Sequence, residues 1–470
     1  MLDWIRQIVA LGVRRPGSPG DLAAEGFLEQ KFQEFGLTEV HREPVPVQYW
    51  ASTETSLVVP ADGDRSIPCF AVPYTAWTDS EGMTAPTVFL QEGTQDNFEA
   101  VDVRGKLVVL DVRFGDFSAD LLKSASHFVH DPAETIPAGV LHTATWLVEN
   151  FAAYFEAERR GALGVIGILR DSPIDGPQQY VPYDGHLKKL PAVWVGRESG
   201  DSLRELARRG ETLTLQSLGT TEEVQSHNVV ATVPGSGDES IVLTCHHDGP
   251  FASAVEDASG LAVLLWLAQH FSAREQPLRR SLVFVASSGH FHGGIGNRVF
   301  VERHREGLLR NTVAALGIEH IAEEAESDGQ GGYQLTGQAE LRVLFVDQGP
   351  RLLSLLEELV GRWQLDRTLA IDPYVFGPEP PCDSAPFFTA GIPSVCHISG
   401  PLYLFDPHDT VDKVRADDLP RVAGIFQELI EAIDPLPAEV LAEGLQRNRN
   451  EPLPPLPPWF CAPEDYPRPE

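Results

Sequence analysis

Short, almost wholly apolar runs alternate with helical patterns through the second half of the chain. Five such runs cover residues 241–245, 281–288, 313–318, 341–348 and 392–398. Residues 261–271 are apolar nearly all round, which predicts a buried helix, and residues 351–363 and 419–433 also have helical spacing. Strands that alternate with helices predict an α/β fold with a mostly parallel central sheet and helices on both faces.

The N-terminal part of the chain has its own helical and extended patterns. Residues 2–13 are expected to form a helix, which the Pro- and Gly-rich stretch after them ends. A second helix is expected over residues 22–37, with Asp21 as its cap. The patterns of residues 41–50 and 55–60 predict two strands.

From about residue 67 the sequence shows shorter strand and helix patterns. Within this stretch, residues 114–155 have no simple period, and we interpret them as a lid. We therefore expect one domain formed by residues 1–66 and 222–435, an inserted β-rich domain over residues 67–221, and a Pro-rich tail over residues 436–470.

Charge and cysteine content narrow the classes of function. The chain has 36 Lys and Arg against 68 Asp and Glu, a formal net charge of -32, which would repel nucleic acid and an anionic membrane. No apolar run approaches the ~20 residues of a membrane span. The five cysteines are scattered without a CxxC pair, and the N-terminal pattern does not resemble a signal peptide. We expect a cytoplasmic protein with a small-molecule or peptide substrate, and its oligomeric state stays open.

Ligand-type side chains follow three of the predicted strands. Residues 246–248 read His-His-Asp, residues 290–292 read His-Phe-His, and residues 319–320 read Glu-His. A single histidine at a strand end is more often a hydrogen-bonded structural residue, and Glu256-Asp257 before the buried helix can simply cap it. Convergence at one edge of a sheet favours a metal or catalytic site instead, because chemistry in open α/β sheets lies beyond the strand ends. Imidazole with carboxylate suits zinc, iron or manganese.

Several longer motifs then point to a known family. They are RRPGSPG with the helix that follows it, HNVVATVPGSGDESIVLTCHHD, EDASG, PFFTAGIPSV and DTVDKV. Together they resemble the zinc aminopeptidases of the M28 type, co-catalytic dizinc exopeptidases on an α/β sheet. The segments VDVRGKLVVLDV and RRGALGVIGIL resemble the protease-associated (PA) domain that is often inserted in this family.

The resemblance implies roles for individual residues. His246 corresponds to a ligand of the first metal and Asp248 to its orienting neighbour, while Glu256 and Glu319 fall on two Asp ligand positions. The family's paired Glu residues, a general base and a ligand of the second metal, fall on His290 and Phe291. The other private ligand of the second metal falls on Phe405. Because phenylalanine cannot ligate a metal, we expect one metal ion in place of two.

Extra ligand-type residues crowd the same loops, and the sequence leaves their roles open. His247, His292, His320, Asp383 and His408 are further candidates for metal or substrate binding, and whether His290, His292 or His320 ligates the metal is unsettled. The first hypothesis is a mononuclear metallohydrolase, with zinc as the metal and His290 as the base, that cleaves an amide or related C–N bond. The alternatives are a His-rich non-haem iron enzyme and a catalytically inactive binding protein.

Overall fold

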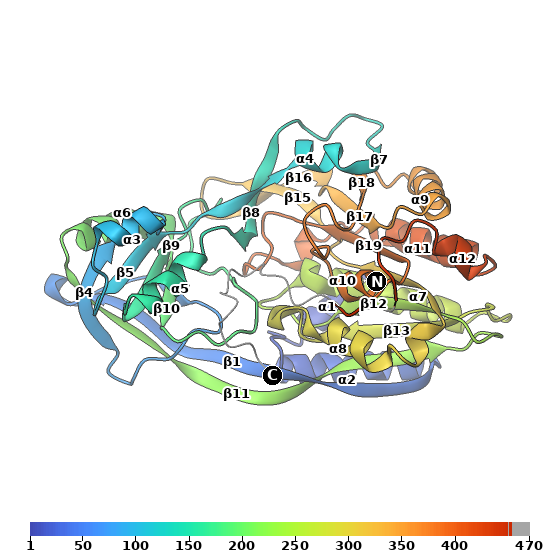
Figure 1. The fold of residues 1–470 in the computed structure, drawn as a ribbon, viewed down its shortest axis with the longest axis horizontal. Coiled ribbons are helices and arrows are strands. Elements are labelled where there is room, and N and C mark those ends of the chain that lie inside the picture. The colour runs from blue at the N-terminus through green and yellow to red at the C-terminus, as the bar shows by residue number, and fades with distance from the viewer. Residues whose placement is uncertain (450, 454–470) are drawn as a thin grey trace.

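A computed structural model describes residues 1–449 and 451–453, and Figure 1 shows two bodies joined by a long ribbon. The ribbon consists of β1 (Thr38–Val59) and β11 (Thr212–Val233), which pair antiparallel along nearly their whole length. One end of β11 joins the main sheet and the other end joins the sheet of the inserted unit. The two strands expected at 41–50 and 55–60 are therefore one strand, and the predicted boundary at 221/222 falls inside β11. The units are joined by continuous strands, and not by loops.

The larger body contains the main sheet, whose strands run in the order β11-β13-β12-β14-β19-β17-β18-β7. Its strands after β11 are β12 (Ser240–His246), β13 (Ser281–Ser287), β14 (Thr312–Ile318), β17 (Arg342–Val346), β18 (Thr368–Ile371) and β19 (Ser394–Ser399). The neighbours β13, β12, β14 and β19 are parallel, whereas β17 runs antiparallel to β19. The prediction of an α/β fold with a mostly parallel sheet is confirmed.

Helices cover both faces of this sheet. One face carries α1 (Leu2–Val9), α2 (Pro19–Glu34), α7 (Gly260–Ser272), α9 (Pro350–Arg362) and α11 (Leu419–Ile433), and the other carries α8 (Ile295–His304) and α10 (Ala385–Thr389). Leu261, Leu264 and Leu265 of α7 are fully buried, and each such side chain contributes about 1.5–3 kcal/mol. Ser18, and not Asp21, caps α2, because its hydroxyl accepts from the Asp21 amide at 3.2 Å.

The inserted unit has its own sheet, in the order β3-β10-β9-β5-β4. Its elements are β2 (Arg65–Ile67), β3 (Cys69–Ala71), β4 (Met83–Phe89), α3 (Gln95–Ala100), β5 (Leu107–Asp111), α5 (Ala152–Arg159), β9 (Gly164–Ile168), β10 (Ala192–Val195) and α6 (Arg197–Arg208). A separate core around Val109, Ile166 and Val193 stabilises it. The likeness to a PA domain stays a prediction.

Part of the insertion returns to the main body. The segment expected to be a lid contains β6 (Phe114–Ser118), α4 (Ala119–Ser124), β7 (Ser126–His130) and β8 (Val140–Val148). Strands β6 and β8 form a hairpin, and β7 pairs antiparallel with β18 as the last strand of the main sheet. Its pairing with β18 attaches this segment to the peptide backbone of the main body.

The described chain ends on the surface of the main body. Two further strands, β15 (Glu323–Ser327) and β16 (Tyr333–Ala339), form a small sheet of their own, and α12 (Ala438–Leu441) is the last helix of the described chain. Beyond α12, Arg449 donates to the carbonyls of Leu309 and Thr312 at 2.7 and 2.6 Å. The predicted tail thus packs against the body up to this point, and residues 450 and 454–470 lie outside the described residues. Among the described helices, none has the length and apolar character that crossing a membrane requires.

Candidate metal centre

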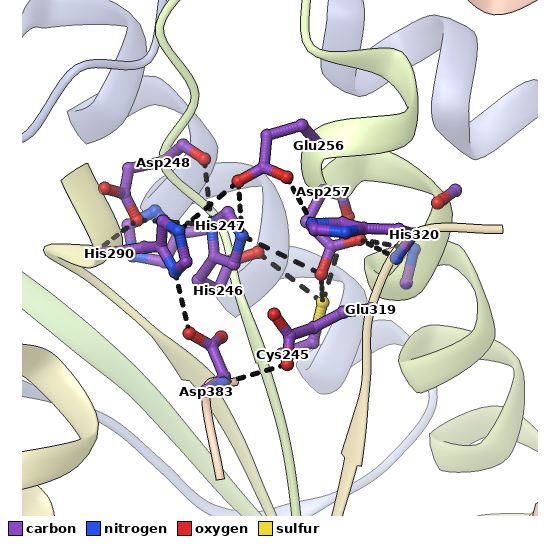
Figure 2. Close-up of polar contacts among 12 residues, drawn as sticks. Cys245, His246, His247, Asp248, Glu256, Asp257, His290, Glu319, His320 and Asp383 are labelled. Atoms are coloured by element: carbon purple, nitrogen blue, oxygen red, sulfur yellow. Dashed lines mark hydrogen bonds and ion pairs between the residues drawn. The ribbon is translucent and has the colours of Figure 1, made fainter. Parts of the chain in front are cut away.

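The ends of three neighbouring strands bring the candidate ligands to one place (Figure 2). His246 is the last residue of β12, His290 follows β13, and Glu319 follows β14. Because β12 lies between β13 and β14 in a parallel arrangement, their carboxyl ends share one edge of the sheet. His246 and Glu319 are fully buried.

Glu256 lies in the middle of this group. Its Oε1 is 3.2 Å from Nε2 of His246 and 3.5 Å from Nε2 of His290, and its Oε2 pairs with Nε2 of His320. The turn that carries Glu256, residues Ala254–Ser259, is held by Asp409, whose carboxylate accepts from the amides of Val255 and Glu256 at 2.8 and 2.9 Å. One carboxylate therefore faces three imidazoles.

Hydrogen bonds on the outer side of the cluster orient the three imidazoles. Nδ1 of His246 donates to the Asp248 carbonyl at 3.0 Å, and Nδ1 of His320 donates to the Ser399 carbonyl at 2.6 Å. Nδ1 of His290 donates to the carboxylate of Asp383 at 2.9 Å. Since each Nδ1 donates outward, each Nε2 points to the interior of the cluster, where it can bind a metal once it has given up its own proton.

Several inward atoms have no hydrogen-bond partner among the described residues. They are Nε2 of the three imidazoles, both carboxylate oxygens of Glu256, Oε2 of Glu319 and Oδ2 of Asp383. Buried polar atoms are normally hydrogen-bonded, so a cluster of donor atoms that meet only in close imidazole–carboxylate contacts suits a bound cation. Donor atoms of His246, His290, Glu319 and Asp383 all lie within 4.8 Å of one another, as do those of His246, Asp257 and His320. These residues fit a divalent metal ion.

The charges of the cluster lead to the same conclusion. Burial opposes protonation of His246, but Asp383 and other carboxylates outweigh it and raise its pKa well above the usual value. Burial likewise opposes protonation of His320, but Glu256 raises its pKa to about 10. Burial and nearby acidic groups raise the pKa of Glu319 well above its ordinary value. Protons thus neutralise a carboxylate-rich pocket that a divalent cation would neutralise instead.

Aromatic rings occupy the side of the cluster where Phe291 and Phe405 lie. The two rings are 5.0 Å apart, and Tyr183 lies 4.8 Å from Phe405 and stacks on His290 at 5.4 Å. Phe291 is fully buried in this group. Phe291 and Phe405 therefore present rings on this side, which cannot ligate a metal.

The structure corrects three of the predicted ligands. His247 pairs with Asp21 at 3.1 Å and with the His227 carbonyl at 3.0 Å, so it fastens α2 to the strand end. His292 packs against Gly185 and the ring of Tyr74. Residues 290–292 form one 3₁₀ turn, in which side chains two residues apart point about 120° apart, so His290 and His292 cannot both face the cluster.

The third correction concerns His408, which is half-exposed and pairs with Asp406 at 2.8 Å, on the ring of Tyr333. Asp248 keeps an orienting role: its carbonyl accepts from His246, and its carboxylate accepts from the amides of His290 and Phe291 at 3.1 and 2.8 Å. It therefore fixes the loop after β13 as well as the imidazole.

Sequence reasoning missed three contributors to the site. Asp257 caps α7 through the Gly260 amide at 3.0 Å, as expected of such a residue, but its other oxygen is 3.9 Å from Nε2 of His246. Asp409 holds the Glu256 turn, and the motif that contains it was the available signal. Tyr183 stacks on His290 from a loop of the inserted unit, and nothing local in the sequence indicates this contact.

A cavity of about 320 Å³ opens beside the cluster. His290, Glu319, His320 and Asp383 line it, whereas His246 and Glu256 do not. The segment 114–155 supplies part of its wall, and its role as a lid stays a prediction. The volume lies within the range of about 300–1,000 Å³ that is typical of ligand pockets.

Comparison with known proteins relates the chain to a family of peptidases. Residues 228–429 match the model of peptidase family M28. The chain is similar to human carboxypeptidase Q, 25% identical over 362 residues that cover 74% of this chain and 68% of the relative, and to the bovine protein of that name, 24% identical over 63% and 59%.

Two solved structures share the fold. A zinc aminopeptidase from Bacillus subtilis has a TM-score of 0.69 at 18% identity, with 95% of this chain and 98% of that one covered. An aminopeptidase from Aneurinibacillus sp. strain AM-1 has a TM-score of 0.64 at 22% identity, with 96% and 97% covered. Residues 228–429 thus match peptidase family M28, the chain is similar in sequence to carboxypeptidase Q, and it shares its fold with these two aminopeptidases.

Proposed function

We propose that this protein hydrolyses an amide or related C–N bond in a peptide or small molecule, using one zinc ion held by His246, Glu256 and Glu319. The M28 domain supports a metal-dependent peptide hydrolase. The observation that carries the proposal is the set of buried donor atoms at the ends of β12, β13 and β14, to which Glu256 adds a carboxylate oxygen 3.2 Å from Nε2 of His246. His320 and Asp383 complete the set as further ligands or hydrogen-bond partners.

When bound, a divalent metal polarises the substrate carbonyl and lowers the pKa of water. The residues of the chain supply orientation and proton transfer. His290 lines the cavity, so a substrate there can reach its Nε2, while its Nδ1 keeps its proton and donates a hydrogen bond to Asp383. His290 takes a proton from the attacking water as the C–O bond forms, and returns it to the nitrogen as the C–N bond breaks.

The packing around His290 suits this role. Its ring lies between His246, at 4.1 Å and 15°, and Tyr183, at 5.4 Å and 7°. A ring held on both faces and at Nδ1 has little freedom to turn, so Nε2 stays directed at the cluster. Phe291 and Phe405 exclude water on the neighbouring side, which is also why we propose one metal ion.

Metal analysis and two substitutions test the proposal. Protein purified without added metal should contain one zinc per chain, and His246→Ala should lose both the metal and turnover of a peptide or amide library. His290→Gln should keep the metal and lose turnover by about 10²-fold or more. The exposed His127→Ala is the matched control and should keep both. Full activity of His246→Ala would refute the proposal.

A second candidate is favoured by the three imidazoles that face one carboxylate. Histidines with a carboxylate also suit iron(II) and oxygen chemistry. Iron in the native protein, with oxygen consumed on turnover, would replace the hydrolase proposal. Protein that holds no metal under any loading condition would favour a binding protein instead.

A further inference from the structure

The cavity beside the metal centre has aromatic walls from the segment 114–155 and from the main sheet. Phe117 of β6 and Trp146 of β8, both from the segment 114–155, meet edge to face at 5.6 Å. Phe345 of β17 and Phe376 of the loop after β18 meet in the same way at 6.2 Å. Four aromatic side chains in the lining favour binding of a flat, apolar group of a ligand.

Five acidic residues line the cavity together with these rings, namely Asp116, Asp184, Glu319, Glu379 and Asp383, and Glu379 lies outside the metal cluster. Glu379 lies in the loop between β18 and α10, is 7% exposed, and lines the cavity. Its Oε1 is buried and has no hydrogen-bond partner among the described residues. Burial raises the pKa of Glu379 to about 7. Arg298 and Arg447 oppose this rise only in part. A buried carboxyl oxygen without a hydrogen-bond partner costs free energy, so a protein that retains one without a ligand loses stability.

The position of Glu379 relates it to the metal centre. Asp383, the partner of His290, follows four residues later in the same loop. Four residues span at most about 14 Å, so both groups lie within reach of one small molecule in the cavity. Arg298 is the only Lys or Arg among the described lining residues, and it already bonds Glu302 at 3.2 Å. The lining therefore suits a donor or a cation better than a substrate carboxylate.

We propose that this cavity is a subsite for a bulky aromatic group of the substrate that ends in a hydrogen-bond donor, with Glu379 as the acceptor. This proposal rests on the proposed function, because the aromatic group in the subsite belongs to the same molecule that is cleaved at the metal centre. The donor is either a neutral hydroxyl or N–H group, or an ammonium group, and the two are separated by the experiment.

The experiment uses three matched amides with phenylalanine, tyrosine and p-aminomethylphenylalanine side chains, which differ only at the ring terminus. Their binding to the metal-loaded protein is measured by calorimetry with uncleaved N-acetyl amides, and their kcat/KM separately. At least one donor-bearing amide should bind about tenfold or more tightly than the phenylalanine amide. Glu379→Leu should reduce this preference to less than twofold.

Glu379→Gln separates the two donor types. The Gln carbonyl still accepts from a hydroxyl, so a preference for tyrosine should survive, whereas a preference for the ammonium group should be lost. Trp146→Ala should weaken all three amides alike. The exposed Glu357→Gln is the matched control and should change nothing.

Thermal stability excludes a merely structural role. Because Glu379 is buried and unpaired, Glu379→Leu should raise the melting temperature while it removes the preference. A lowered melting temperature with an unchanged preference, or no preference in the wild type, would overturn the subsite. Binding that depends on Glu379 in a protein without metal or turnover would instead overturn the proposed function and leave the subsite standing.

Discussion

Arg14 connects the N-terminal segment to the loop that supports His246. It is fully buried, and its guanidinium donates to the carbonyls of His247, Ala252 and Ser253 at 3.0, 3.2 and 3.0 Å. Its backbone also pairs with Gly249 in both directions at 3.0 Å. Replacement by methionine keeps much of the apolar stem and removes every side-chain donor.

The magnitude follows from these contacts. Three carbonyls lose a charged donor, and each unsatisfied buried group costs about 1–3 kcal/mol. Burying the charged guanidinium also costs free energy, which is why burial lowers its pKa. Removing the charge removes this cost and offsets part of the loss. We therefore expect Arg14→Met to reduce the free energy of unfolding by about 3–5 kcal/mol, against about 5–15 kcal/mol for a whole domain.

Urea unfolding followed by circular dichroism measures the effect, with a chelator present so that metal binding does not contribute. Arg14→Lys should be nearly as unstable, because the three donors of an ammonium group share one nitrogen and cannot match carbonyls arranged around a planar guanidinium fork. Arg6→Met is the control, since the Arg6 side chain is 58% exposed, and should change stability by less than about 0.5 kcal/mol. A loss below about 1 kcal/mol in Arg14→Met would refute the reasoning.

Three further predictions concern charge and the metal centre. Burial opposes ionisation of Glu43, but His304 and Arg303 outweigh it and lower its pKa from 4.5 to about 2. The stability that this adds is complete above pH 4.5 and is lost as the pH falls toward 2. Glu43→Gln should therefore differ from the wild type by about 3 kcal/mol at pH 6 and hardly at pH 2 in urea titrations. A chelator should lower the melting temperature of the wild type in thermal denaturation, because buried carboxylates lose their cation, but should leave His246→Ala unchanged. His292→Gln and His408→Gln should keep the metal content of the wild type in elemental analysis, since both side chains lie outside the cluster.

The sequence predicted the elements whose patterns are local and strong. The buried helix α7 and the apolar strands β12, β13 and β14 were all expected, because an all-apolar run of strand or helix length fits only the interior. The strand ends then placed His246 and Glu319 at one edge. The resemblance to the M28 family added Glu256 as an expected ligand. It also indicated that Phe291 and Phe405 stand where the family has ligands of a second metal.

Other parts of the fold depend on pairing between distant segments, which no local pattern records. Strand β1 is continuous because β11, more than 150 residues later, pairs along it. Strand β7 joins the main sheet because β18 offers a free edge, although residues 126–130 belong to the inserted stretch. Such pairings are set by the whole chain, and not by the periodicity of either strand.

The sequence by itself determined which side chains reach the metal edge of the sheet, since residue type and strand position are local properties. Only the tertiary structure decided which of them face the metal. His290 turns inward and His292 outward because they lie in one 3₁₀ turn, and His247 is taken up by Asp21 of a distant helix. Glu379 has no local signal at all, because its place in the cavity depends on walls from β6, β8 and β17.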